Sequence, residues 1–311
     1  MNAGATASSS AARPLTPVRV LLRNVVDYAG LFPPASLSMD AAVREYAAQR
    51  SGDDAWLLGR FVLPAARLDE FELQAGAALP HEGANSWALS ALLSGDIEED
   101  VARVALFNER HRDARDGAVQ VDTVELKAQT VREIARACEL LDGAFDTYVE
   151  IPTAEDPTEL VAAIGAAHVK AKIRTGGVTP DLFPASANIV RFARACIAGS
   201  VAFKATAGLH HSFREEYPLT YAPDAARGTM FGFLNVLLCV TALCDGVSNA
   251  DAVALLEECD ARSVTFGDDG VRWRGRHLSH DALARARESM TAFGSCSFRE
   301  PVAELRSLGL L

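Results

Sequence analysis

The stretches HVKAKIRTGG (168–177) and VAFKATAGLHH (201–211) decide how this chain is expected to fold. Each contains a β-strand pattern that ends in a glycine-containing turn, and a helical pattern over residues 186–198 lies between them. Such a strand–helix–strand unit predicts two parallel strands joined by a right-handed crossover. Both strands nevertheless contain lysine, a residue that buried parallel strands normally exclude.

The same alternation of strand and helix extends over most of the chain. Further strand patterns occupy residues 26–32, 57–64, 86–93, 119–128, 146–152 and 263–268, and further helical patterns occupy residues 39–50, 65–78, 97–112, 129–141, 156–167 and 230–245. Eight such units predict an α/β fold, a closed (β/α)8 barrel of the TIM type. An open doubly wound sheet is the alternative, but GLFPPAS follows the first strand where that fold has G-x-G-x-x-G.

We expect one barrel domain over residues 19–311, preceded by a flexible N-terminal tail over residues 1–18. The tail is small and polar, which argues against a secretory signal. The segment VTFGDDGVRWRG predicts a hairpin around Asp269 and Gly270, so we expect an insertion near the eighth strand. The apolar helix at 230–245 suits either burial in the core or an interface in a homo-oligomer.

Composition excludes several classes of partner. The net charge is −11 and there is no run of Lys or Arg, so we expect no nucleic acid. No apolar run reaches the roughly 20 residues of a membrane helix, so we expect no membrane. The six cysteines form no C-x-x-C pair, which indicates reduced thiols and a cytoplasmic protein. No cofactor is expected.

Charged residues recur on one face of several predicted strands, because side chains alternate along a strand. The sets that share a face are Glu125 with Lys127, Tyr148 with Glu150, Lys170 with Lys172 and Arg174, and Lys204 with Thr206. The opposite faces of the sixth and seventh strands are apolar and suit packing against helices. We therefore expect the charged faces to point into the barrel and to form a functional site at its C-terminal end. An ion-pair network that only fills the barrel is the alternative.

Three short motifs resemble those of the class I deoxyribose-phosphate aldolases and their barrel relatives. They are Lys172 in KIRTG, Lys204 in KATAGL and Asp122 in DTV, in the family's order within residues 119–211. The resemblance implies that Lys172 forms a Schiff base, that Lys204 tunes it, and that a fourth-strand acid relays protons. Arg174 departs from the small residue of the family. Asp122 and Glu125 have opposite parity, so without a bulge they cannot both face inward, and the identity of the acid stays open.

An amine must be unprotonated to attack a carbonyl group, and burial or a neighbouring cation lowers the pKa of a lysine. We therefore predict an aldolase-like lyase that acts on a small anionic carbonyl substrate. Its predicted catalytic residues are Lys172, Lys204, Asp122, Glu125 and Glu150. Lys172 is the expected nucleophile, and the carboxylates are the expected proton carriers.

Residues near the same strand ends are expected to bind the substrate. Arg174 suits a carboxylate or phosphate, and glycine turns bring backbone N–H groups near an anion. The predicted binding residues are Asp27, Arg60, Arg174, Thr175, Gly176, Gly177, Thr206, Gly208 and His210. Two other functions stay open. One is a divalent-metal-dependent isomerase or lyase, with a histidine of the His210–His211 pair beside Glu125 and Glu150. The other is a non-catalytic barrel that binds a small anion.

Overall fold

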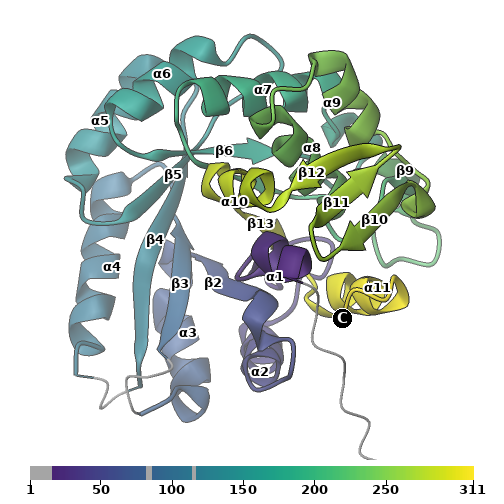
Figure 1. Cartoon of the computed structure of the whole chain (residues 1–311). Coiled ribbons are helices and arrows are strands. Elements are labelled where there is room, and N and C mark those ends of the chain that lie inside the picture. The colour runs from purple at the N-terminus through teal and green to yellow at the C-terminus, as the bar shows by residue number, and fades with distance from the viewer. Residues whose placement is uncertain (1–15, 82–85, 114–116) are drawn as a thin grey trace, which may run out of the picture.

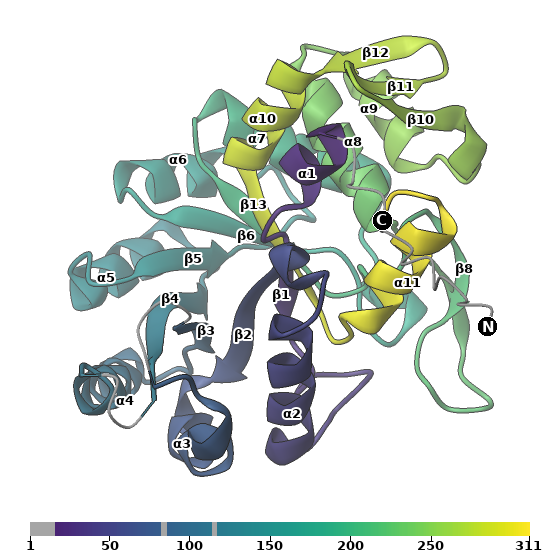
Figure 2. The same ribbon diagram turned by 60° about the horizontal axis from the view of Figure 1, so that its bottom comes forward.

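The computed structural model describes residues 16–81, 86–113 and 117–311. Its eight parallel strands form a closed barrel in the order β1-β13-β7-β6-β5-β4-β3-β2, which Figures 1 and 2 show from two sides. The barrel strands are β1 (Val26–Tyr28), β2 (Leu58–Pro64), β3 (Trp87–Leu92), β4 (Val119–Lys127), β5 (Asp146–Glu150), β6 (Lys170–Arg174), β7 (Phe203–Thr206) and β13 (Met290–Ser295). The predicted fold class is confirmed.

Helices cover the outside of the barrel (Figure 2). They are α1 (Thr16–Leu22), α2 (Met39–Arg50), α3 (Leu68–Ala75), α4 (Ile97–Arg110), α5 (Val131–Leu141), α6 (Thr158–Ala166), α7 (Ser186–Ala198), α8 (Phe233–Cys244), α9 (Asn249–Leu256), α10 (His280–Ser289) and α11 (Arg299–Ser307). Side-chain caps mark the start of α2, α4, α5, α9 and α10. At the start of α5, for example, the Thr130 side chain accepts a hydrogen bond from the backbone N–H of Glu133, and the Glu133 carboxylate accepts one from the N–H of Gln129.

The eighth barrel strand lies later in the chain than the sequence pattern predicted. Residues 263–268 contribute β10 (Val264–Gly267), which with β11 (Gly270–Trp273) and β12 (Arg276–Ser279) forms a three-stranded antiparallel sheet outside the barrel (Figure 1). The barrel closes instead through β13, which pairs with β7 and β1. The prediction of an insertion near the eighth strand is confirmed, and the placement of that strand at 263–268 is wrong. The β13 sequence MTAFGS follows α10 directly, so no turn signal marks its start.

The N-terminal region differs from its prediction in two respects. Strand β1 ends at Tyr28, and the remainder of the predicted strand 26–32 belongs to the following loop. Residues 1–15 of the predicted tail lie outside the described residues, and the next residues form α1, whose Val18 and Leu21 side chains are fully buried.

The apolar core lies between the strands and the surrounding helices. On one side it is an aromatic cluster of Tyr46, Phe61, Phe71, Trp87 and Phe107, with neighbouring ring centroids 4.9–6.2 Å apart. These rings come from α2, β2, α3, β3 and α4, so they join three helices to two strands. Aromatic pairs at such distances stabilise a core beyond the area that they bury.

Helix α8 contains the apolar segment that the sequence showed at residues 230–245. Every residue from Phe233 to Leu243 is buried, because α8 packs against α7, α9 and α10. Burial within the chain therefore accounts for the segment that also suited an oligomer interface. Across the described residues, no helix is both long enough and apolar enough to span a membrane.

Candidate active site

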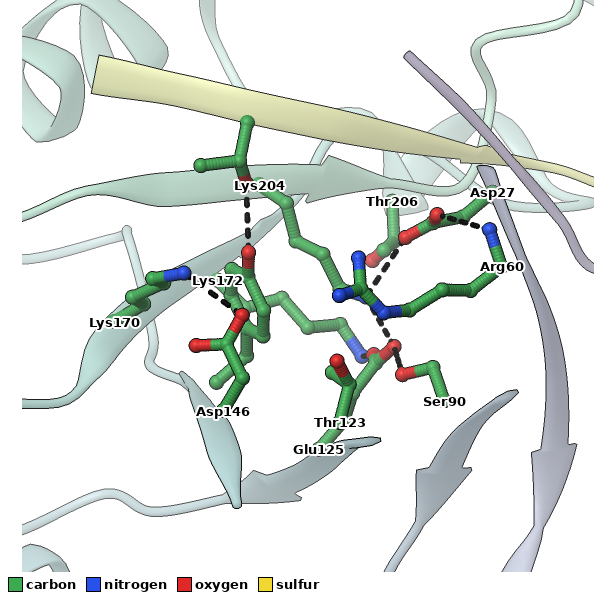
Figure 3. Close-up of polar contacts among 12 residues, drawn as sticks. Asp27, Arg60, Ser90, Thr123, Glu125, Asp146, Lys170, Lys172, Lys204 and Thr206 are labelled. Atoms are coloured by element: carbon green, nitrogen blue, oxygen red, sulfur yellow. Dashed lines mark hydrogen bonds and ion pairs between the residues drawn. The ribbon is translucent and has the colours of Figure 1, made fainter. Parts of the chain in front are cut away.

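The strand register brings the two lysines of the sequence motifs together. Lys172 of β6 and Lys204 of β7 are direct partners across that strand pair. Figure 3 shows both side chains directed toward Glu125 of β4. Lys172 Nζ lies 2.8 Å from Glu125 Oε2, and Lys204 Nζ contacts the other oxygen of the same carboxylate. The two ammonium groups are thus closer than the Debye length of about 10 Å at 0.1 M salt.

Two further carboxylates complete this buried network. Glu150 Oε2 lies 2.9 Å from Lys172 Nζ, and Asp27 Oδ2 lies 3.1 Å from Lys204 Nζ. The hydroxyl of Ser90 donates a hydrogen bond of 2.6 Å to Glu125 Oε1. We call Asp27, Glu125, Glu150, Lys172 and Lys204 the mouth network. It sets two ammonium groups against three carboxylates, so each buried charge has a partner of opposite sign.

The mouth network fixes the protonation of its central members. Burial by itself would raise the pKa of Glu125, but the ammonium groups of Lys172 and Lys204 hold that pKa well below its ordinary value. Burial would lower the pKa of Lys204, yet Glu125 and Asp27 raise it above its ordinary value. The ring centroid of Tyr148 lies 4.6 Å from Lys204 Nζ and further favours the cation. Lys204 is therefore an ammonium group in the resting site.

A cavity of about 200 Å³ opens beside the mouth network at the C-terminal ends of the strands. The predicted site residues that line it are Asp27, Glu125, Lys172, Arg174, Gly177, Lys204, Thr206 and His210. Much of the remaining wall is apolar and includes Ala29, Phe32, Pro33, Pro34, Val62, Leu92 and Val178. A cavity of this size suits a small molecule rather than one of drug size, for which pockets measure about 300–1,000 Å³.

Arg174 supplies an available positive charge at this cavity. It is exposed, and it follows Lys172 by two residues on the same strand face. Within the ranges that the structure describes, no hydrogen bond or ion pair engages its guanidinium group. An unpaired guanidinium beside buried lysines favours an anionic ligand.

Three predicted binding residues hold the turns together and do not line the cavity. The Thr175 hydroxyl is buried and donates a hydrogen bond of 2.7 Å to the Ala207 carbonyl. A Cβ atom on Gly176 would lie 2.5 Å from the ring of Phe183, and one on Gly208, whose φ is +76°, would lie 2.9 Å from the same ring. The close approach of the β6 and β7 turns therefore requires both glycines.

The side chains of Arg60 and Asp122 form a pair nearer the N-terminal ends of the strands, and the backbone N–H of Arg60 donates a hydrogen bond of 2.9 Å to Asp27 Oδ1 of the mouth network. Arg60 Nε lies 2.7 Å from Asp122 Oδ1, and Nη2 lies 3.0 Å from Oδ2. On β2, Arg60 precedes Val62, and on β4, Asp122 precedes Glu125. Val62 and Glu125 line the cavity, whereas Arg60 and Asp122 do not.

A bulge in β4 decides which fourth-strand carboxylate faces the lysines. The β3–β4 register shifts so that Asp122 has no partner residue on β3, and this is the bulge whose presence the sequence could not decide. Glu125, not Asp122, is the fourth-strand carboxylate that contacts the lysines.

Some positions at the site were not predicted from the sequence, and the direction of one β4 side chain was predicted wrongly. Ser90 lies within the apolar pattern SWALSALL, and Cys296, which lines the cavity, follows the unpredicted strand β13. The loop that contains Pro33 and Pro34 could have been found from its position after β1, since such loops form the mouth of a barrel. Lys127 was expected to face inward with Glu125, and this is wrong. It is the last residue of β4, and its side chain is 76% exposed.

A comparison of the chain with models of known families, with curated proteins and with solved structures found no match. Among residues 16–81, 86–113 and 117–311, no three His, Cys, Asp or Glu side chains gather as a metal site would require. The carboxylates that the metal hypothesis needs, Glu125 and Glu150, face lysine ammonium groups instead. The molecule is thus defined by its fold and site as a TIM-type barrel with a buried lysine–carboxylate network at its mouth.

Proposed function

We propose that the protein is a lyase of the class I aldolase type, which forms a Schiff base between Lys172 and a small anionic carbonyl substrate. The observation that carries this proposal is the mouth network. It holds Lys172 at the wall of a cavity, in contact with two carboxylates and beside the fixed positive charge of Lys204. Catalytic nucleophiles of this kind are lysines in buried sites next to another cation. The motif resemblance supports the same assignment.

Lys172 suits the nucleophile better than Lys204 does. The Lys204 side chain is 1% exposed and is held as a cation by Glu125, Asp27 and the ring of Tyr148. The Lys172 side chain is 7% exposed, and one of its two carboxylates, Glu150, is not shared with Lys204. Glu150 is therefore the acceptor that we assign for the proton that Lys172 must lose before it attacks.

The chemistry follows the ordinary course of amine catalysis. The free amine of Lys172 adds to the carbonyl carbon, and the resulting carbinolamine takes up a proton and loses water to give a protonated imine. When the substrate is cleaved, its hydroxyl group gives up a proton, the departing fragment becomes a carbonyl compound, and the electron pair of the breaking C–C bond moves into the imine and leaves an enamine. A proton then adds to the enamine carbon. Water hydrolyses the second imine, so the water that was lost is returned and Lys172 is freed.

Arg174 is the group that we assign to the anionic end of the substrate. Its guanidinium fork matches a carboxylate or phosphate in two parallel hydrogen bonds. Because Arg174 and Lys172 share a strand face two residues apart, the anion and the reacting carbonyl belong to one small molecule. The apolar wall near Phe32, Val62 and Leu92 then faces the carbon chain.

Borohydride trapping tests the proposal, since borohydride reduces an imine to a stable secondary amine. The purified protein is treated with borohydride in the presence of pyruvate, acetaldehyde or dihydroxyacetone phosphate, and its intact mass is measured. We expect a covalent mass increase with at least one of these compounds, and none in Lys172→Ala. The absence of any increase in the wild type, or an equal increase in Lys172→Ala, would overturn the proposal.

A further inference from the structure

His210 lines the same cavity as the lysines, yet the Schiff-base steps make no use of it. It lies in the loop after β7 and is 6% exposed. Its Nδ1 atom is 3.4 Å from Ser295 Oγ, 3.6 Å from Cys296 Sγ and 3.8 Å from Glu300 Oε2. A buried imidazole at the wall of a reaction cavity is a candidate for proton transfer.

The hydrogen bonds of Ser295 favour one tautomer of His210. The Ser295 hydroxyl donates its proton to the carbonyl of Ser297 at 2.7 Å, so its oxygen can accept a hydrogen bond from His210 Nδ1, which lies 3.4 Å away. We assign the proton of the neutral imidazole to Nδ1 on this basis, which leaves a lone pair on Nε2. Within the described part of the chain, Nε2 has no hydrogen-bond partner, and it is not among the fully buried polar atoms that lack one. Nε2 is therefore not fully buried, and the residue to which it belongs lines the cavity.

The surroundings keep the imidazole of His210 neutral at rest and place one carboxylate beside it. Burial, with a contribution from His211, lowers the pKa of His210 to about 4, so its imidazole is an acceptor at neutral pH. The carboxylate of Glu300 lies on the Nδ1 side and faces the positive charge when Nε2 takes a proton. Burial raises the pKa of the Cys296 thiol to about 11, so the neighbouring sulfur stays protonated and is a poor nucleophile.

We propose that His210 is the general base and acid for the hydroxyl group of the substrate in the C–C bond step, which makes the substrate a β-hydroxycarbonyl compound with an anionic group. This inference rests on the proposed function. In cleavage, Nε2 takes the hydroxyl proton, the C–O bond becomes a carbonyl, and the C–C electron pair moves into the imine on Lys172. In the addition direction, the imidazolium returns its proton to the new alkoxide. Each proton and electron pair is thus accounted for.

The adjacent residue, His211, provides a matched control. Its Nδ1 lies 2.5 Å from Glu304 Oε1, and its ring stacks on Tyr217 with centroids 3.4 Å apart. Glu300 and Glu304 are one turn apart on α11 and face the two histidines in parallel. His211 does not line the cavity. A role in holding the loop applies to both histidines, whereas a role in catalysis applies to His210 alone.

The test separates enamine formation from the C–C bond step. Exchange of the methyl protons of pyruvate or acetaldehyde in D₂O, followed by NMR, reports enamine formation and needs only the lysine chemistry. Addition of the same donor to glyceraldehyde or glyceraldehyde 3-phosphate reports the C–C bond step. The variant is His210→Asn, because the asparagine amide keeps a donor near the position of Nδ1 and removes Nε2. We expect exchange within about 3-fold of wild type and addition slower by about 10²–10⁴-fold, the usual contribution of a general base.

The control and the alternatives have distinct outcomes. His211→Asn keeps both rates near those of wild type. Equal losses of exchange and addition in His210→Asn, or an unchanged rate of addition, would contradict the role of His210 while exchange in the wild type still supports the Schiff base. Neither exchange nor borohydride trapping in the wild type would overturn the proposed function and this inference together. If His210→Asn does not fold, His210→Gln is measured in the same way, and the same two outcomes decide.

Discussion

The interior of the barrel contains two sets of charges that are built in different ways. Nearer the N-terminal strand ends, Arg60 pairs with Asp122 and Lys170 pairs with Asp146, with side chains that are 29–38% exposed. At the mouth, Lys172 and Lys204 share one carboxylate, and their side chains are at most 7% exposed. Figure 3 shows the Lys170–Asp146 pair set apart from the mouth network.

The difference underlies our proposal that one set serves stability and the other serves chemistry. An exposed one-to-one ion pair contributes about 0–1 kcal/mol and removes little from water. A buried set costs several kcal/mol per ion in desolvation, and apolar residues of similar size often stabilise a fold as well or better. Filling the barrel with the mouth network therefore costs more desolvation free energy than filling it with apolar side chains. Its position at a cavity, with Lys172 at the wall, favours a catalytic role.

The largest effect is expected at Lys172, the proposed nucleophile. Lys172→Ala removes the attacking nitrogen, so proton exchange into pyruvate or acetaldehyde should fall to the uncatalysed rate. Lys170→Ala, two residues earlier on the same strand, removes a partly exposed ion pair outside the cavity and should retain most of the wild-type rate. Exchange followed by NMR measures both variants. Similar exchange rates in the two variants would contradict the assignment of catalysis to the mouth network rather than to the pairs nearer the N-terminal strand ends.

The next effect concerns stability. Glu125→Gln removes the carboxylate that both lysines share and leaves buried ammonium groups poorly compensated, so we expect a loss of about 3–5 kcal/mol in the free energy of unfolding. Asp122→Asn breaks a partly exposed pair on the same strand and should cost about 0–1 kcal/mol. Urea unfolding of the two variants against wild type gives both values. A larger loss in Asp122→Asn than in Glu125→Gln would contradict our description of the two sets.

The loss of unfolding free energy in Glu125→Gln should also depend on pH. The pKa of Glu125 in the folded chain is depressed, so its stabilising contribution is present above the unfolded value of about 4.3 and is lost as pH falls through the folded pKa. The difference in unfolding free energy between wild type and Glu125→Gln should therefore be large at pH 6–7 and shrink only below about pH 4.3. Unfolding series at several pH values measure it, and a difference that shrinks on approach to pH 6 would disagree with the depressed pKa.

A smaller effect is expected at Arg174, which we assign to the anionic end of the substrate. Arg174→Lys keeps the charge and loses the planar fork, so KM for an anionic substrate should rise by about 10- to 100-fold, the value of a hydrogen bond to a charged group. The value of kcat should change little, because Arg174 is assigned to the unreactive end of the substrate. Arg60→Lys makes the same change in the N-terminal pair and should leave KM unaltered. Steady-state kinetics of both variants decide whether Arg174 binds substrate.

Much of the barrel could be predicted from the sequence, because each strand–helix unit carries its own periodicity. The exception is the eighth barrel strand, which was placed in the wrong segment. Strand β13 follows α10 without a turn, and β10 imitates a barrel strand in composition while pairing outside the barrel. Only the closure of the barrel, a long-range property, distinguishes the two segments.

The site was predictable to the extent that side-chain alternation determines it. Alternation placed Lys172 and Lys204 on inward faces, and the structure brings both onto Glu125. Alternation does not give height along the barrel axis, so Arg60 and Asp122 were grouped with the mouth although they pair below it. It also fails at bulges and strand ends, which is why Asp122 was ambiguous and the direction of Lys127 was wrong.

The location of the trapped adduct tests the central claim most directly. The wild-type protein is reduced with borohydride in the presence of pyruvate, acetaldehyde or dihydroxyacetone phosphate and then digested, and the modified lysine is identified by tandem mass spectrometry. Our account predicts the adduct on Lys172, with Lys204 and Lys170 unmodified. An adduct on Lys204 would reverse the roles of nucleophile and fixed cation, and an adduct confined to Lys170 or to surface lysines would contradict the assignment of the mouth network as the active site.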